Sequence, residues 1–141
     1  MMCVVCSTLY RTSLRGEESV DRVLFLDDKS MEVKGVHELE AFENGSVCSS
    51  FFLPESTHSD CRMEFVIVGT AFVLPDEQQP SRGRILVFSQ NEDGDFVVVA
   101  ETVTKGGVFS LTSTHDRLIA GIDCKVIHNI IRRDDCSNRL S

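Results

Sequence analysis

The sequence predicts an all-β fold, a partial β-propeller of about two four-stranded antiparallel blades and part of a third. Short apolar segments rich in β-branched residues recur along the chain, and Gly, Pro, Asn and Asp residues separate them. The order of these segments repeats, which is typical of proteins built from stacked units. At 42% hydrophobic residues, the chain has enough apolar material to bury a core.

Three strands are expected in the first part of the chain. Residues 4–9 and Val23–Leu26 are short and apolar, which suits buried strands. The segment 11–21 between them is polar and charged, so we expect a loop there. Met31–Val36 alternates crudely after a polar turn, so we expect it to pair with the second strand.

The next strand is expected at Val47–Leu53. The dipeptide Asn44-Gly45 precedes it and is a favoured hairpin turn. His37–Phe42 is the one segment with any helical character, and its capping is poor. A polar loop over 54–62 closes this part of the chain.

The segment 64–88 is the most informative stretch. Phe65–Val68 is a short β-branched run that suits a strand buried on both faces. Pro75 and Pro80 bracket an acidic turn that a helix could not cross. Ile85–Phe88 is a second apolar strand, so the segment is expected to be a strand, a long turn and a strand.

The remaining strands follow clear turn signals. Asp93-Gly94 is a hairpin dipeptide, Gly106-Gly107 breaks the chain, and His115-Asp116 is a further turn. The strands expected between and after these turns are 96–102, 108–111, 118–122 and 125–131.

An internal repeat sets the architecture. Each unit runs in the same order: a small-residue strand, an apolar strand that ends in Gly, a second apolar strand and a more exposed strand. Four strands in ~40–45 residues plus insertions is the period of a WD40-like propeller blade. The matching segments are 22–26 with 84–88, 45–49 with 106–110, 65–69 with 117–121, and 84–87 with 125–128.

The repeat also sets the expected domain organisation. Residues 1–131 form the partial propeller, and 132–141 form a polar, disordered tail. A blade needs a neighbour on each face, so we expect the chain to be a fragment of a larger propeller and to melt broadly in isolation. The alternative is a small free-standing β-sandwich, against which the repeat and the uncovered blade faces count.

Composition excludes several classes of function. The net charge is −8, from 14 basic and 22 acidic residues, and no basic stripe is present to contact phosphates. Direct nucleic-acid binding is therefore not expected, and a protein partner with basic features fits better. No run approaches the ~18 apolar residues of a membrane helix. Met1–Cys6 lacks a basic leader, so we expect no signal peptide.

The six cysteines predict no metal site or cofactor. Cys3-x-x-Cys6 is the only close pair, and no second pair or His pair follows at zinc-ligand spacing. We expect reduced, mostly buried structural cysteines.

The sequence does not predict an enzyme. It contains no nucleophile elbow, phosphate-binding loop or zinc-protease motif. Asp27-Asp28 and Asp134-Asp135 are adjacent pairs, which point to opposite faces of a strand. Ser110 and His115 lack a placed orienting acid.

Three segments carry a resemblance to a known family. They are V-G-T-A-F-V-L-P-D-E-Q-Q-P-S-R-G-R-I-L-V-F (68–88), V-A-E-T-V-T-K-G-G-V-F-S-L (99–111) and R-L-I-A-G-I-D-C-K-V (117–126). They resemble the C-terminal propeller of the damage-specific DNA-binding protein 1 family. That family belongs with the A subunit of the cleavage and polyadenylation specificity factor and with subunit 3 of splicing factor 3b. The resemblance covers about 23–127 and favours the damage-binding branch.

The resemblance implies an adaptor in the nucleus, and also in the cytoplasm. Family members carry three propellers, of which one binds a cullin-4 scaffold and two receive substrate receptors of a ubiquitin ligase. The implied partners are those receptors and the other propellers, with DNA contacted only through the complex, and with no membrane or small molecule. The alternatives are an RNA-processing scaffold or a non-functional truncated fragment.

The family pattern also points to candidate partner-binding residues. Asp76 and Glu77 lie in the Pro-bracketed turn, which meets the receptor in the family. Gln78 and Gln79 stand where the family is more acidic. The alternative is that Asp76 and Glu77 form a solvated turn without a partner. We expect Arg82 and Arg84 to neutralise this turn.

Overall fold

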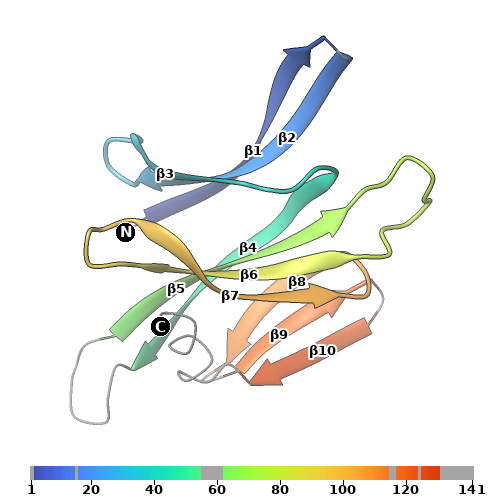
Figure 1. The fold of residues 1–141 in the computed structure, drawn as a ribbon. Helices are drawn as coiled ribbons and strands as arrows, with labels where there is room; N and C mark the ends of the chain where they lie inside the picture. Colours follow the sequence, from blue (N-terminus) through green and yellow to red (C-terminus); the bar gives the residue numbers. More distant parts are fainter. Residues whose placement is uncertain (1, 15, 55–61, 115–116, 124, 131–141) are drawn as a thin grey trace.

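The computed structural model describes residues 2–14, 16–54, 62–114, 117–123 and 125–130, which form ten strands and no helix (Figure 1). The fold is the predicted all-β partial propeller. The strands are β1 (Met2–Ser13), β2 (Gly16–Asp27), β3 (Val33–Glu38), β4 (Glu43–Pro54), β5 (Arg62–Phe72), β6 (Gly83–Gln90), β7 (Phe96–Thr104), β8 (Val108–Thr114), β9 (Arg117–Ile122) and β10 (Lys125–Ile130).

The strands form three antiparallel sheets. The central blade is four-stranded in the order β4-β5-β6-β7, and three-stranded sheets β1-β2-β3 and β8-β9-β10 flank it. β8, β9 and β10 repeat the order of β4, β5 and β6, while β2 and β3 repeat β6 and β7. The repeat found in the sequence is therefore confirmed by the topology.

The register supports the same correspondence. A β-bulge lies between Phe25 and Leu26 on β2, and another lies between Val87 and Phe88 on β6. These positions are equivalent when Arg22 is matched with Arg84. Bulges bend a strand and increase its twist, so the two sheets curve at the same place.

The middle strands of the central blade, β5 and β6, are buried on both faces, which explains why β5 is apolar almost throughout. Val66 and Val68 face the β1-β2-β3 sheet, and Phe65 and Ile67 face the opposite sheet. The first core cluster comprises Val23, Phe25, Leu39, Val66, Val68, Leu86 and Phe88, and the second comprises Phe65, Ile67, Val87, Val99 and Leu118.

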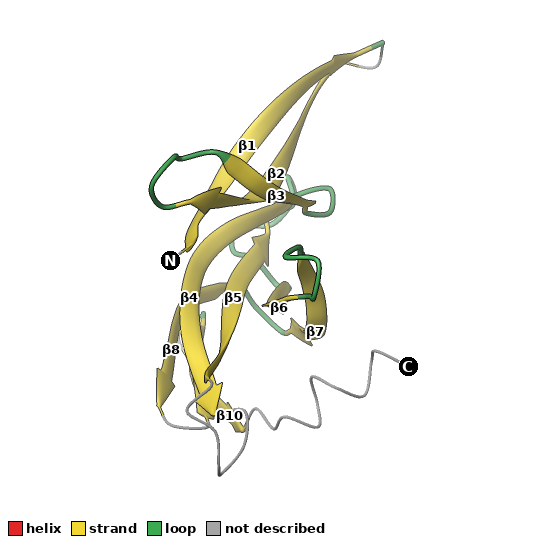
Figure 2. Cartoon of the chain, turned by 90° about the vertical axis from the view of Figure 1, so that its left-hand side faces the viewer, coloured by secondary structure: helices red, strands yellow, loops and turns green. Residues whose placement is uncertain are grey.

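The prediction of a loop at 11–21 is wrong. β1 and β2 stay paired from Met2 with Asp27 to Ser13 with Gly16. Figures 1 and 2 show the far end of this hairpin extending beyond the other sheets. An antiparallel ladder is held by main-chain hydrogen bonds, so polar side chains do not end it.

The prediction of a hairpin turn at Asn44-Gly45 is also wrong. Both residues lie in β4, paired with Ala71 and Thr70, and a bulge follows between Gly45 and Val47. The chain instead turns just before β4, where Phe42 takes a φ of 62°. The segment 37–42 is the end of β3 and this turn, without a helix.

Other turns agree with the sequence. Asp93-Gly94 forms the β6–β7 turn, where Gly94 has a φ of 87°. The expected turn at 115–116, the tail 132–141 and most of the loop 54–62 lie outside the described residues. Within the part that is described, no helix has the length and apolar character needed to cross a bilayer.

Candidate partner-binding surface

Four turns gather at one end of the sheets, at the right of Figure 1. They comprise residues 39–42, 73–82, 105–107 and 123, which we call the turn face. Main-chain hydrogen bonds hold neighbouring turns together. Val73 N donates to Phe42 O at 2.8 Å, and Asp123 N donates to Gly107 O at 3.0 Å.

The Pro-bracketed turn has a defined backbone. Glu77 N donates to Leu74 O at 3.2 Å, which closes a four-residue turn with Pro75 at its second position. Proline pre-sets the φ that this position requires. Phe72 N donates to Arg82 O at 2.9 Å, so the two strand ends are held at the base of the turn.

Asp76 and Glu77 both lie exposed on this turn. The Glu77 carboxylate accepts hydrogen bonds from the hydroxyl of Ser81 at 2.7 Å and from its backbone N–H at 3.4 Å. Glu77 therefore helps to fix the loop, and Asp76 occupies the centre of the tight turn. Their role in partner binding stays a prediction.

Exposed apolar residues lie on the same face, and the sequence did not reveal them as a group. Phe42 is 53% exposed. Val73 and Leu74, the first two residues of the neighbouring 73–82 turn, are also exposed. A positive φ is uncommon for a bulky residue, so the Phe42 backbone is strained. Contacts across turns bring these residues together, and no local periodicity marks them.

Arg82 and Arg84 do not neutralise the acidic turn, which corrects the expectation. In the described part of the chain, the ion pairs of Arg84 go to Glu40, Glu43 and Glu101 at 3.6, 2.6 and 3.4 Å. The Arg82 guanidinium lies 3.9 Å from the Phe72 ring centre and 3.9 Å from Glu40. Both arginines instead bind the acidic residues of neighbouring strands and turns.

The buried member of this cluster is Glu43, which is only 1% exposed. Its carboxylate accepts two hydrogen bonds from Arg84 and one from Glu40 N. The hydrogen bonds to Glu43 raise the pKa of Arg84, with burial opposing the shift. A buried carboxylate needs such partners, because an unpaired charge there is very costly.

Close backbone contacts join the Pro-bracketed turn to the β7–β8 turn. A Cβ on Gly83 would lie 2.4 Å from Thr70 O and 2.6 Å from Gly106 O. Gly106 O also accepts a hydrogen bond from the Thr104 hydroxyl at 2.7 Å. Only glycine permits this approach, so the base of the Pro-bracketed turn packs directly against the β7–β8 turn.

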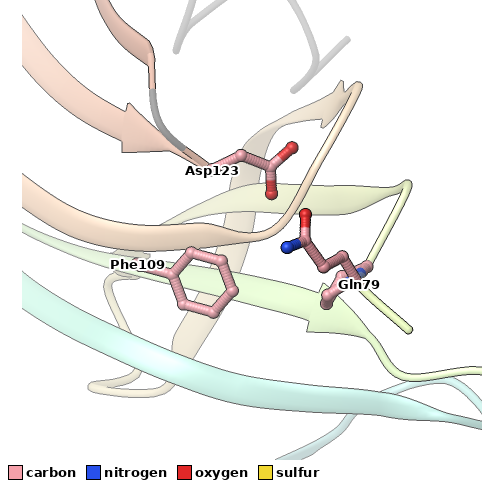
Figure 3. Close-up of a pocket in the computed structure, with 4 residues that line it drawn as sticks. Gln79, Phe109 and Asp123 are labelled. Atoms are coloured by element: carbon pink, nitrogen blue, oxygen red, sulfur yellow. The ribbon is translucent and has the colours of Figure 1, made fainter. Parts of the chain in front are cut away.

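A cleft of about 370 Å³ opens beside these turns (Figure 3). Gln79, Pro80, Phe109 and Asp123 line it. Gln79 belongs to the Pro-bracketed turn, so the cleft is continuous with the turn that the sequence predicted as a binding element.

Cysteine chemistry adds little to this surface. Cys48 is exposed, which differs from the expected buried cysteines. It lies on β4, the first strand of the blade, in which every second residue is exposed. Within the described ranges, no group of three or more His, Cys, Asp or Glu side chains could hold a metal ion.

Comparison with known proteins identifies the family of the chain that carries this surface. Residues 21–135 match the family model described as the CPSF A subunit region. The chain belongs to this family. It is 36% identical over 137 residues to DNA damage-binding protein 1 of Oryza sativa subsp. japonica and of Solanum lycopersicum. It is 38% identical over 138 residues to DNA damage-binding protein 1a of Arabidopsis thaliana.

Each of these alignments covers 96% of this chain and 12% of the relative, so the chain spans about 12% of the length of the relatives it matches. The family resemblance drawn from the sequence is thereby confirmed, and the CPSF A subunit region has the architecture of a propeller scaffold.

Proposed function

We propose that this chain is a non-catalytic protein-interaction scaffold whose turn face docks substrate receptors of a cullin-4 ubiquitin ligase. In this role it serves the recognition and repair of UV-damaged DNA in the nucleus, and contacts DNA only through the assembled complex. The observation that carries the proposal is the likeness to DNA damage-binding protein 1 over 96% of the chain, which includes the whole turn face.

The chemistry of the turn face supports this proposal. It combines exposed apolar side chains at Phe42, Val73 and Leu74 with the carboxylates of Asp76 and Glu77. Protein interfaces combine an apolar centre with a polar rim in this way. Main-chain hydrogen bonds and close backbone contacts already link the turns, so docking should cost less conformational entropy than it would for unlinked loops.

Purification from cells that carry a tag at the endogenous gene tests the proposal on the protein as the cell makes it. We expect cullin-4 and its receptors to co-purify, and the Asp76→Asn/Glu77→Gln variant to recover several-fold less receptor. Glu92→Gln/Asp93→Asn is the matched control, because it removes an exposed acidic pair from the opposite end of the blade. This control is expected to recover receptors as the wild type does.

Two results would overturn the proposal. The first is equal receptor recovery by both acidic-pair variants. The second is recovery of polyadenylation or splicing subunits in place of cullin-4, which would assign the chain to the RNA-processing branch of the family.

A further inference from the structure

The cleft beside the Pro-bracketed turn presents an aromatic ring and a carboxylate to the same space. In Figure 3, Phe109 lies on one side, Asp123 on another, and the Gln79 amide points between them. The three residues come from β8, the turn that follows β9 and the β5–β6 turn. The site is thus assembled by the fold from segments far apart in the sequence.

The ring of Phe109 packs against the backbone and stays accessible. Phe109 is 52% exposed. A Cβ on Gly107 would lie 2.7 Å from the Cζ atom of this ring, so the ring packs directly over the Gly107 backbone. The ring is therefore supported on one side by the Gly107 backbone, while about half of the side chain stays accessible for a ligand to stack on it.

The carboxylate of Asp123 is fixed by main-chain contacts. Its Oδ1 accepts the Gly107 N–H at 3.2 Å, and its own N–H donates to Gly107 O at 3.0 Å. A carboxylate has about four lone-pair sites, so acceptor capacity remains for a ligand. Asp123 also has a φ of 52°, a conformation that Asp and Asn tolerate better than other non-glycine residues.

The charge of the described residues around the cleft favours a cation. None of the described residues that line it is basic, and Asp76 and Glu77 lie on the turn that supplies Gln79. A phosphate or carboxylate ligand would meet repulsion here. A single carboxylate with an amide is a poor donor set for a metal ion, which prefers several charged ligands.

We propose that this cleft binds an arginine side chain of a protein partner. Its guanidinium would stack on the ring of Phe109 and donate hydrogen bonds to the carboxylate of Asp123, with the Gln79 carbonyl as a further acceptor. A planar guanidinium satisfies stacking and carboxylate pairing at once, whereas an ammonium is a compact and strongly hydrated point charge. This inference rests on the proposed function and names the partner chemistry that the turn face recognises.

Titration of the full chain with two capped peptides tests the inference. One is acetyl-Gly-Ser-Gly-Arg-Gly-Ser-Gly-amide, and the other carries citrulline, the neutral isostere, in place of arginine. NMR shifts of the Phe109 and Asp123 amides report occupancy of the cleft. We expect the arginine peptide to bind about tenfold more tightly, and the difference to shrink as salt rises. A lysine peptide is expected to fall between the two.

Asp123→Asn is the decisive variant, because Asn keeps the backbone conformation and can still accept the Gly107 N–H. It should abolish the preference for arginine over citrulline. Phe109→Leu should weaken both peptides and keep part of the preference, and Asp93→Asn at the far end of the blade should change nothing. Equal binding of both peptides, or a preference that survives in Asp123→Asn, would overturn the inference.

The outcome is separable from that of the receptor-docking experiment. An arginine preference that depends on Asp123, combined with receptor recovery that is insensitive to Asp76 and Glu77, would reject the proposed docking and retain the cleft. Loss of receptor in the Asp76→Asn/Glu77→Gln variant, combined with equal binding of the arginine and citrulline peptides, would retain the proposed docking and reject the arginine cleft.

Discussion

Arg84 on β6 binds Glu43 on β4 through two parallel contacts, Nε to Oε1 at 2.8 Å and Nη2 to Oε2 at 2.6 Å. β4 and β6 are not neighbours in the sheet, since β5 lies between them. The pair therefore ties together strands that share no backbone hydrogen bonds. Glu101 on β7 extends the same contact to the outer strand, at 3.4 Å.

Arg84→Met is expected to destabilise the central blade by about 3 kcal/mol, because it leaves the Glu43 carboxylate buried without its partner. Hydrogen exchange should show faster exchange of β5 and β6 amides. Lys34→Met is the control, since it removes an exposed pair with Glu32 that contributes about 0.5 kcal/mol or less. Equal protection in the two variants would contradict a structural role for the Arg84–Glu43 pair.

His37 is expected to make the fold less stable in mild acid. Burial lowers the pKa of His37, and the charge of Arg84 lowers it further. The unfolded chain therefore takes up the proton first, and the stability contributed by neutral His37 is lost as pH falls below about 6.5. Above that pH both states are neutral, and this residue gives no pH dependence.

Comparison with His37→Gln isolates this effect. The variant loses the edge contact between the imidazole and the Phe88 ring, whose centres lie 5.1 Å apart, at every pH. The stability difference from wild type should be largest near neutral pH and shrink toward pH 5, as followed by exchange of β3 and β6 amides. A difference that stays constant across this range would show that His37 is not held neutral by the fold.

Gly106→Ala is expected to distort the turn face. Gly106 has a φ of 149°, and a Cβ there would lie 2.1 Å from Oδ2 of Asp123. Strain and displacement of Asp123 together should cost about 1–3 kcal/mol. The amides of Gly107 and Asp123 should then exchange faster.

Gly94→Ala provides the comparison for that result. Gly94 has a φ of 87°, but its added Cβ would meet only Nε2 of Gln90, at 3.6 Å. Its cost should be limited to about 1 kcal/mol of backbone strain, confined to the β6–β7 turn. If Gly94→Ala loosens the turn face as much as Gly106→Ala does, the close packing of Gly106 on Asp123 is not the cause.

Strand positions were predictable because they depend on local patterns. The β-branched run 65–68 and the turn signal at Asp93-Gly94 each act over a few residues, and both agree with the structure. The segment 11–21 was missed because its polar strands are held by backbone pairing, which composition does not report. The same limit applies to Asn44-Gly45, where pairing with β5 overrides a favoured turn dipeptide.

The candidate site was predictable only in part. Pro75 and Pro80 mark the turn that carries Asp76 and Glu77, so its existence follows from local chemistry. The partners of Arg84 do not follow from local chemistry, because Glu43 lies 41 positions away in the chain. The acidic turn is much nearer in the sequence, so it was predicted as the partner instead. The left-handed backbone of Phe42 was equally hidden, since its carbonyl oxygen bonds to Val73 N, 31 positions away in another turn.

Phe42→Asn is expected to separate folding from partner binding. Asn tolerates the left-handed backbone conformation better than Phe, and the Phe42 side chain is 53% exposed, so little core is lost. Stability should be unchanged or higher by up to about 1 kcal/mol. If Phe42 anchors a receptor at the turn face, its removal should weaken binding at least about tenfold, as for an aromatic hot spot.

Paired measurements decide between anchoring and a purely structural strain at Phe42. Amide exchange in β4 and β5 reports the fold, and recovery of receptors by the tagged protein reports binding. Val103→Asn is the control, because Val103 is an exposed apolar residue on β7 and lies outside the turn face. Unchanged exchange with lost receptor in Phe42→Asn alone supports anchoring. Unchanged receptor recovery would show that the exposed Phe42 ring takes no part in docking. The strained backbone at Phe42 would then serve only to direct the chain into β4.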